Sequence, residues 1–257
     1  MRTMQTAFIF LLLTFSGLTY ALDGSFDRSV EVEKYIEVYK TKTRGGVIEA
    51  SKRIHVAGLA DPQLAAAINE RLLRDHVGES VSGSIGTEYL EWMVKALAST
   101  GIAEYETTIK QVAKSTGARC SICREEWEKI SWYRARNEIA SSREHHRAGD
   151  DPRITQMLNL LLTPDFSYRF FAAERMNRER LLDPRLMEVV SQQVLEHMND
   201  TPRGSNHDQG KAMGLYVKLL GYSGNVKYRD TLNRLLASKA SSVIKKHAKE
   251  ALRRMEQ

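Results

Sequence analysis

Apolar residues recur at intervals of three and four along most of the chain after residue 28, which is the period of a helix with one buried face. No stretch alternates apolar and polar residues with an enrichment in β-branched side chains, so the pattern predicts an all-α chain without strands. Because each expected helix has a single apolar face, it must pack against neighbouring helices to bury that face. The expected helices span residues 29–42, 47–57, 62–76, 87–99, 103–116 and 121–145, followed by 151–163, 167–180, 184–198, 208–221, 225–238 and 241–255.

Several short motifs predict where these helices begin and end. Asp61-Pro62 and Asp183-Pro184 each offer an N-cap carboxylate followed by a proline at the first helical position, where the missing N–H costs no hydrogen bond. Gly58 is expected to cap the end of the second helix. The run Arg44-Gly45-Gly46 is expected to end the first helix.

A longer segment also occurs twice. Val94 to Ser115 matches Val217 to Ser238 at a shift of 123 positions, and the two Asp-Pro motifs match at a shift of 122. Self-similarity at a fixed separation is the signature of a repeat architecture. We therefore expect two homologous halves, residues 22–146 and 147–257, related by internal duplication. Equivalent hairpin turns are expected at Gly101 and Gly224.

The C-terminal part of the chain resembles a known repeat family. The run Val243-Ile244-Lys245-Lys246-His247-Ala248-Lys249-Glu250-Ala251-Leu252 is similar to the second-helix signature of HEAT and HEAT-like repeats, with a hydrophobic and basic start and small residues before a leucine. The Gly224-Asn225-x-x-Tyr228 turn, which leads into a helix with Leu232 and Leu235, resembles exported bacterial HEAT-repeat proteins. The resemblance implies an α-solenoid of about six helical hairpins and a binding role. It carries no catalytic residues.

The N-terminus has the pattern of a secretory signal peptide. Arg2 precedes an apolar run from Ala7 to Leu13, which continues less strictly to Leu18, and Thr19-Tyr20-Ala21 offers a cleavage site between small residues. An uncleaved anchor is the alternative, but a membrane span needs about 20 apolar residues, and threonine, serine and glycine interrupt this run. We expect residues 1–21 to be removed and the remaining chain to be exported without a membrane span. The periplasm is the expected compartment, and secretion is the alternative.

The charge of the chain is mildly basic. Loss of Arg2 with the signal peptide lowers the formal net charge from +6 to +5, and charges of both signs are interspersed. This distribution is typical of a solvated surface, and a nucleic acid partner is not expected. Lys245, Lys249 and Arg253 form a basic face at four-residue spacing on the last helix. That face could bind an anionic partner or could be the polar outer surface that a terminal repeat needs.

Cys120 and Cys123 form the only cysteine pair, and a disulfide between them is chemically permitted in an exported chain. A redox-active pair is expected beside a βαβ pattern, whereas this pair opens a predicted helix. Haem attachment needs a histidine where Arg124 stands, and a zinc site needs two further ligands. A local disulfide and two ordinary thiols both remain open.

No metal site, cofactor site or catalytic residue is predicted. The sequence contains no nucleophile-elbow motif, phosphate loop, dinucleotide fingerprint or zinc-protease motif. The expected helix 121–145 has one apolar side with Trp127 and Tyr133 and another with Trp132 and Ile139, so it is expected to contact both halves. An exposed aromatic groove is the alternative.

These features predict a non-enzymatic, exported scaffold of HEAT-like repeats that binds another protein. The identity of that protein and the oligomeric state do not follow from the sequence. The loops 78–86 and 199–207 are candidates for contacts with a partner, or are simple spacers. The alternative function is a redox or other accessory protein of the cell envelope that uses Cys120 and Cys123.

Overall fold

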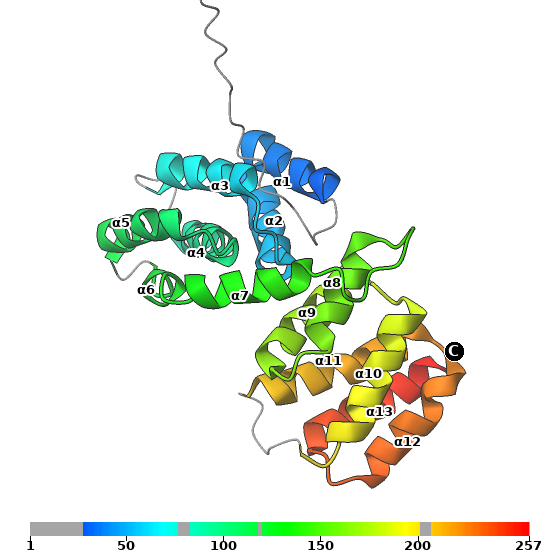
Figure 1. Cartoon of the computed structure of the whole chain (residues 1–257). Helices are drawn as coiled ribbons and strands as arrows, with labels where there is room; N and C mark the ends of the chain where they lie inside the picture. Colours follow the sequence, from blue (N-terminus) through cyan, green and yellow to red (C-terminus); the bar gives the residue numbers. More distant parts are fainter. Residues whose placement is uncertain (1–27, 77–82, 118–119, 201–206, 257) are drawn as a thin grey trace, which may run out of the picture.

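The computed structural model describes residues 28–76, 83–117, 120–200 and 207–256, and within these residues every regular element is helical (Figure 1). The all-α prediction is therefore confirmed. The predicted signal peptide lies outside the described residues. None of the described helices combines the length and the apolar character needed to span a bilayer.

The helices lie close to the ranges predicted from the sequence. In the first half they are α1 (Ser29–Thr41), α2 (Arg44–Ala57), α3 (Pro62–Asp75), α4 (Gly83–Ser99), α5 (Glu106–Thr116), α6 (Cys123–Glu126) and α7 (Ile130–Ser141). In the second half they are α8 (Pro152–Leu161), α9 (Phe166–Glu179), α10 (Pro184–His197), α11 (Asp208–Ser223), α12 (Arg229–Ala237) and α13 (Ser242–Arg254). Short 3₁₀ turns at Ala103–Tyr105 and Val226–Tyr228 lead into α5 and α12.

The predicted start signals act as helix caps. Leu64 N–H donates to Asp61 Oδ1 at 2.9 Å, and Arg185 N–H donates to Asp183 Oδ1 at the same distance. Each carboxylate therefore satisfies an N–H that has no partner within its own helix. Gly58 caps α2 in the left-handed conformation, with φ of 68°.

Two predicted boundaries are wrong. Arg44-Gly45-Gly46 does not end a helix, because these residues form the first turn of α2. A Cβ at Gly46 would lie 2.9 Å from Lys42 Cβ, so a glycine is what allows α2 to begin this close to the end of α1. The predicted loop 78–86 is wrong at its end, since Gly83 begins α4. Residues 77–82 and 201–206 lie outside the described residues, and with them most of both candidate loops.

The predicted helix 121–145 is also wrong as a single element. α6 ends at Glu126 and α7 begins at Ile130. Between them Lys129 N–H donates to Glu126 O at 3.2 Å and Ile130 N–H donates to Trp127 O at 3.4 Å. These bonds span three residues instead of the four of an α-helix and so bend the chain. The buried Glu126 carboxylate fixes the bend, because it accepts hydrogen bonds from Tyr133 Oη at 2.9 Å and Lys129 Nζ at 3.1 Å.

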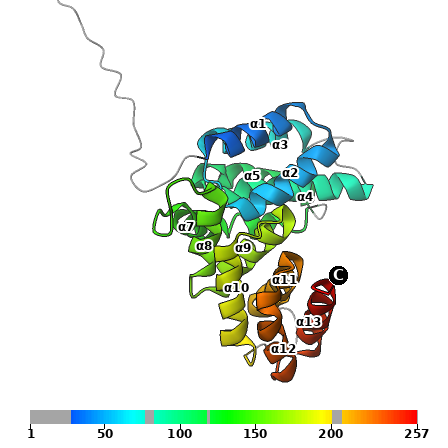
Figure 2. The ribbon, with the colours of Figure 1, turned by 90° about the vertical axis from the view of Figure 1, so that its right-hand side faces the viewer.

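A row of five helices runs through the molecule. α4 packs on α2, α2 on α9, α9 on α11 and α11 on α13, and these contacts include the most extensive ones in the structure. Figures 1 and 2 both place the helices of the first half together above those of the second half. Each half has its own hydrophobic core, one built between Val32 and Tyr133 and the other between Ala140 and Met255.

The order of helices in this row differs from the order along the chain. Stacking in chain order would place α7 between α4 and α9, whereas α2 contacts α9 directly. α7 instead packs against both halves, since Tyr133 belongs to the first core and Ala140 to the second. The predicted contact of this segment with both halves is therefore confirmed.

Candidate binding surface

A groove of about 990 Å³ opens on the helix row in the second half. None of its lining residues belongs to α8, α10 or α12, so it lies on the side of the row that these helices leave uncovered. The lining residues are Phe170, Glu174, Asn177 and Arg178 of α9, Gly210, Lys211, Gly214, Leu215 and Lys218 of α11, Lys239, Ala240 and Ser241 of the segment before α13, and Ser242, Val243, Ile244 and His247 of α13.

Glycines on α11 shape this groove. A Cβ at Gly221 would lie 2.7 Å from Ala251 Cα, so α11 and α13 approach each other this closely only because residue 221 has no side chain. Gly214 leaves space in front of His247, whose Cδ2 is 3.7 Å from the position that a Cβ would take. Val243, which also lines the groove, is 54% exposed.

The groove is basic. Arg178 pairs with Glu174 at 2.6 Å, and Lys211 lies 3.4 Å from Asp208. Among the described residues, no ion pair involves Lys218 or Lys239. Four cationic side chains thus face a lining in which the described residues provide one carboxylate, that of Glu174.

His247 adds a neutral polar group to the groove. Burial, together with the positive charge of Lys218, lowers the pKa of His247 below its usual value of 6.5, so the imidazole is neutral at pH 7. Its Nδ1 atom is buried and makes no hydrogen bond within the described part of the chain. Nδ1 lies 4.0 Å from Glu250 Oε2, whereas the Cδ2 and Nε2 edge of the ring faces Gly214.

A second cavity of about 520 Å³ lies between the two halves. Its walls come from the beginning of α1 and α8, from Arg53 of α2 and from the end of α9, and Arg178 lines both this cavity and the groove. The fully buried Arg175 lies behind it and connects the halves. Its guanidinium donates to Ala57 O at 2.9 Å, pairs with Glu179 at 3.0 Å, and also binds the carboxylate of Glu31.

A second buried arginine stabilises the ends of two helices. Arg136 of α7 donates to His55 O at 2.7 Å and to Ser99 O at 3.0 Å, which are carbonyls at the C-termini of α2 and α4. Asn137 donates to Ser99 O and Thr100 O, both at 2.9 Å. Burial lowers the pKa of Arg136 to about 10, so the side chain keeps its charge at neutral pH. These bonds satisfy carbonyls that have no partner within their own helices.

Aromatic side chains gather where α2, α4, α7 and α9 meet. The His55 ring makes edge contacts with Trp92, Tyr133 and Phe171 at centroid distances of 5.9, 5.7 and 5.1 Å. Trp132 also packs on Phe171, at 5.4 Å. These rings fill the junction between the halves instead of forming the open aromatic groove that was the alternative interpretation.

The predicted basic face does not line the groove. Lys249 and Arg253 are exposed on α13, and Lys245 is half-buried. Measured around the helix at about 100° per residue, Lys249 and Arg253 point roughly 160° and 120° away from His247. The cations of the groove come from three segments that only the fold brings together. Of these cations, Lys218 lies in the duplicated segment of the sequence, where it is the counterpart of Lys95.

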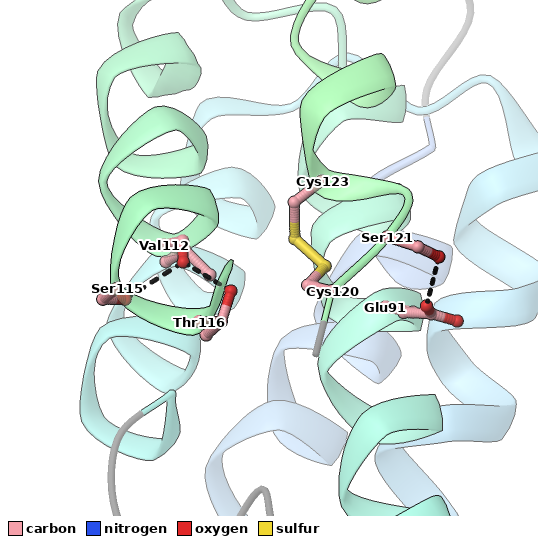
Figure 3. The surroundings of a disulfide bond; sticks show 7 residues. All are labelled: Glu91, Val112, Ser115, Thr116, Cys120, Ser121 and Cys123. Carbon is pink, nitrogen blue, oxygen red and sulfur yellow. Dashed lines mark hydrogen bonds between the residues drawn. A yellow bond between two sulfur atoms is a disulfide. The ribbon is translucent and has the colours of Figure 1, made fainter. Parts of the chain in front are cut away.

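Cys120 and Cys123 form a disulfide with their Cα atoms 5.4 Å apart (Figure 3). Both residues belong to the core of the first half and are only 3% and 0% exposed. Ser121, between them, donates to Glu91 Oε1 of α4 at 3.3 Å. The cystine therefore links the beginning of α6 to the core. Within the described residues, no three His, Cys, Asp or Glu side chains are placed to hold a metal ion.

Comparisons with known proteins assign no family to this chain. No protein-family description matches it, and no curated protein matches it. Among solved structures, the crystal structure of an engineered protein aligns over 88% of this chain and 96% of its own, with 17% sequence identity and a TM-score of 0.31. A TM-score this low supports no conclusion about fold or function.

Proposed function

We propose that this chain is a non-enzymatic, exported scaffold of HEAT-like repeats that binds another protein through the uncovered side of its helix row. The observation that carries the proposal is the groove over α9, α11 and α13, which is open and basic. Binding sites often lie on such concave surfaces of stacked helices.

Affinity capture tests the binding role. The chain from residue 22 onward is immobilised and exposed to an envelope extract, with empty resin and the heat-unfolded chain as controls. We expect at least one protein to be retained by the folded chain alone. Repeated capture without a specific partner would contradict the scaffold.

Export requires a separate test. The mass of the protein purified from its native cells should correspond to cleavage after Ala21, and the protein should fractionate with periplasmic markers or appear in the medium. An intact N-terminus in the cytoplasmic fraction would overturn this part of the proposal.

The redox alternative receives no support from the site. A thiol–disulfide oxidoreductase needs a sulfur atom that its substrate can reach. Both cysteines are almost fully buried here, which is typical of a structural cross-link.

A further inference from the structure

We infer that the groove over α9, α11 and α13 binds an acidic segment of a partner protein, in which carboxylates alternate with apolar side chains. This inference rests on the proposed scaffold function and specifies the chemistry of its partner. The groove is lined by four cationic side chains and by apolar groups of Phe170, Leu215 and Val243. A ligand that contacts both the cationic and the apolar side chains must itself combine negative charge with apolar surface.

The charge of the groove indicates what it recognises. Arg178 and Lys211 are already partly neutralised by Glu174 and Asp208. Lys218 and Lys239 have no ion-pair partner among the described residues, although both line the groove. Complementary charge across an interface guides association and selects the partner. Carboxylates that bind Lys218 and Lys239 would complete the pairing.

The first half of the chain carries fewer cations at the equivalent positions. At shifts of 122 and 123, Arg178 corresponds to Val56 and Lys239 corresponds to Thr116, neither of which is charged, whereas Lys218 corresponds to Lys95. In the first half Lys52 forms an ion pair with Glu88 at 3.1 Å, which neutralises the same side of the helix row. The charges of Arg178 and Lys239 therefore belong to the second half, and only the cation at the position of Lys218 is common to both halves.

The open space is also specific to the second half. Asn177 and Leu215 of the groove correspond to His55 and Trp92, and these two rings pack together at a centroid distance of 5.9 Å. In the first half, bulky rings thus occupy the region that remains open in the second. A volume of about 990 Å³ can accommodate several side chains of an extended peptide.

Fluorescence anisotropy with a defined probe tests the inference. The probe is a labelled octapeptide of alternating glutamate and leucine, and the reference is the same peptide with lysine in place of glutamate. We expect the full chain from residue 22 onward to bind the acidic probe and not the basic one. In the double variant Lys218→Glu with Lys239→Glu, binding of the acidic probe should be weaker by about tenfold or more at ~0.15 M salt.

A matched control separates this site from general electrostatic attraction. The double variant Lys249→Glu with Arg253→Glu makes the same change in net charge at positions of α13 that do not line the groove, and we expect affinity to stay within about twofold. The neutral pair Lys218→Gln with Lys239→Gln should reduce affinity less than the glutamates do, and it keeps the test valid if the glutamate variant fails to fold. Circular dichroism verifies the fold of each variant.

Three results would overturn the inference. The first is that the acidic probe does not bind, and the second is that the groove variant and the control variant lose affinity for it equally. The third is that the protein binds anionic phospholipid vesicles through Lys218 and Lys239 but does not bind the peptide. The last result would identify a lipid surface. These failures are distinct from failure of the scaffold itself. A specific partner that is captured by wild type and equally by the groove variant would preserve the scaffold and place its binding site elsewhere.

Discussion

The side-chain amide of Asn137 stabilises the C-terminus of α4 directly and the C-terminus of α2 through Arg136. Its Nδ2 donates to two carbonyls at the end of α4, and its Oδ1 accepts from Arg136 Nε at 3.0 Å. All these groups are buried. A buried carbonyl that loses its partner costs about 1–3 kcal/mol, which makes this residue a sensitive point of the fold.

Replacement of Asn137 by alanine should lower the free energy of unfolding by about 3 kcal/mol, because two carbonyls and the Arg136 guanidinium lose a partner together. Urea denaturation followed by circular dichroism measures the change. Asn233→Ala is the matched control, since Asn233 is an exposed residue of α12 and its loss should change stability by less than about 0.5 kcal/mol. Equal effects at the two positions would show that the bonds of Asn137 are not stabilising.

His55 should make the stability of the protein depend on pH. Burial, together with the positive charges of Arg136 and Lys95, lowers the pKa of His55 well below its usual value of 6.5. As the pH falls below about 6.5, the unfolded chain therefore binds a proton that the folded chain does not. The free energy of unfolding should fall from there down to the lower pKa of the folded state.

The variant His55→Phe tests this sign, because phenylalanine can keep the ring contacts with Trp92, Tyr133 and Phe171. Urea midpoints at about pH 7.5 and 5.5 should differ less in the variant than in the wild type. The difference does not vanish, since His247 also has a lowered pKa. Replacement of the exposed His207 by glutamine should leave the wild-type difference unchanged. An unchanged difference in His55→Phe would exclude His55 as its source.

At the scale of helices, the sequence predicted elements whose signals are local and missed those that depend on packing. The Asp61-Pro62 cap and the Gly58 turn are decided by residues within one turn, and both are confirmed. The break before Ile130 was not predicted, because it depends on the burial of Glu126 beside Tyr133. Apolar residues keep their helical spacing through the bend, so the sequence pattern alone predicts one continuous helix.

The same limit applies to the candidate site. Lys245, Lys249 and Arg253 stand out in the sequence because they share one side of a single helix. Lys218 and Lys239 belong to different segments, and their convergence requires α11 and α13 to pack at the distance that Gly221 permits. The spacing of charges along one helix does not show which charges from three separate segments lie together in the fold.

The cystine should stabilise the bent segment at the start of α6. A disulfide that closes a loop this short contributes roughly 2 kcal/mol, so the double variant Cys120→Ser with Cys123→Ser should unfold at correspondingly lower urea concentration. Dithiothreitol should destabilise the wild type in the same assay and leave the variant unchanged.

Burial of the two sulfurs predicts their reactivity as well. In native buffer the disulfide should resist dithiothreitol, and alkylation of the reduced thiols should become complete only in denaturant. Rapid reduction of the folded protein, or exchange activity in an insulin-reduction assay, would favour the redox alternative over a structural role.

At the scale of the whole molecule, the two cores are joined by helix packing and by one buried arginine. The halves meet where α7 packs on α8 and α2 on α9, through the rings around His55, and through Arg175 with Glu31 and Ala57 O. The chain passes between the halves in the segment 142–151, where Arg143 and Arg147 are exposed. Since each half has its own core, weakening the junction should separate the halves before either one unfolds.

Replacement of Arg175 by methionine tests this expectation. The variant loses the link to Glu31 and leaves Ala57 O without its side-chain donor, and breaking a buried ionic contact of this kind costs about 3–5 kcal/mol. We expect trypsin under native conditions to cleave at Arg143 and Arg147 faster than in the wild type, and to leave two fragments that resist further digestion. Mass spectrometry identifies the fragments, and circular dichroism shows whether each remains helical.

Arg178→Met is the control for that experiment, because Arg178 lies one turn further along α9, has a side chain that is 33% exposed instead of fully buried, and pairs only with Glu174 among the described carboxylates. Its cleavage rate at Arg143 and Arg147 should match that of the wild type. If Arg175→Met instead exposes sites throughout both halves at once, the two cores unfold as a single cooperative unit and Arg175 contributes to global stability. If the variant is cleaved no faster than the wild type, the contacts of α2 and α9 and the rings around His55 hold the halves together without Arg175.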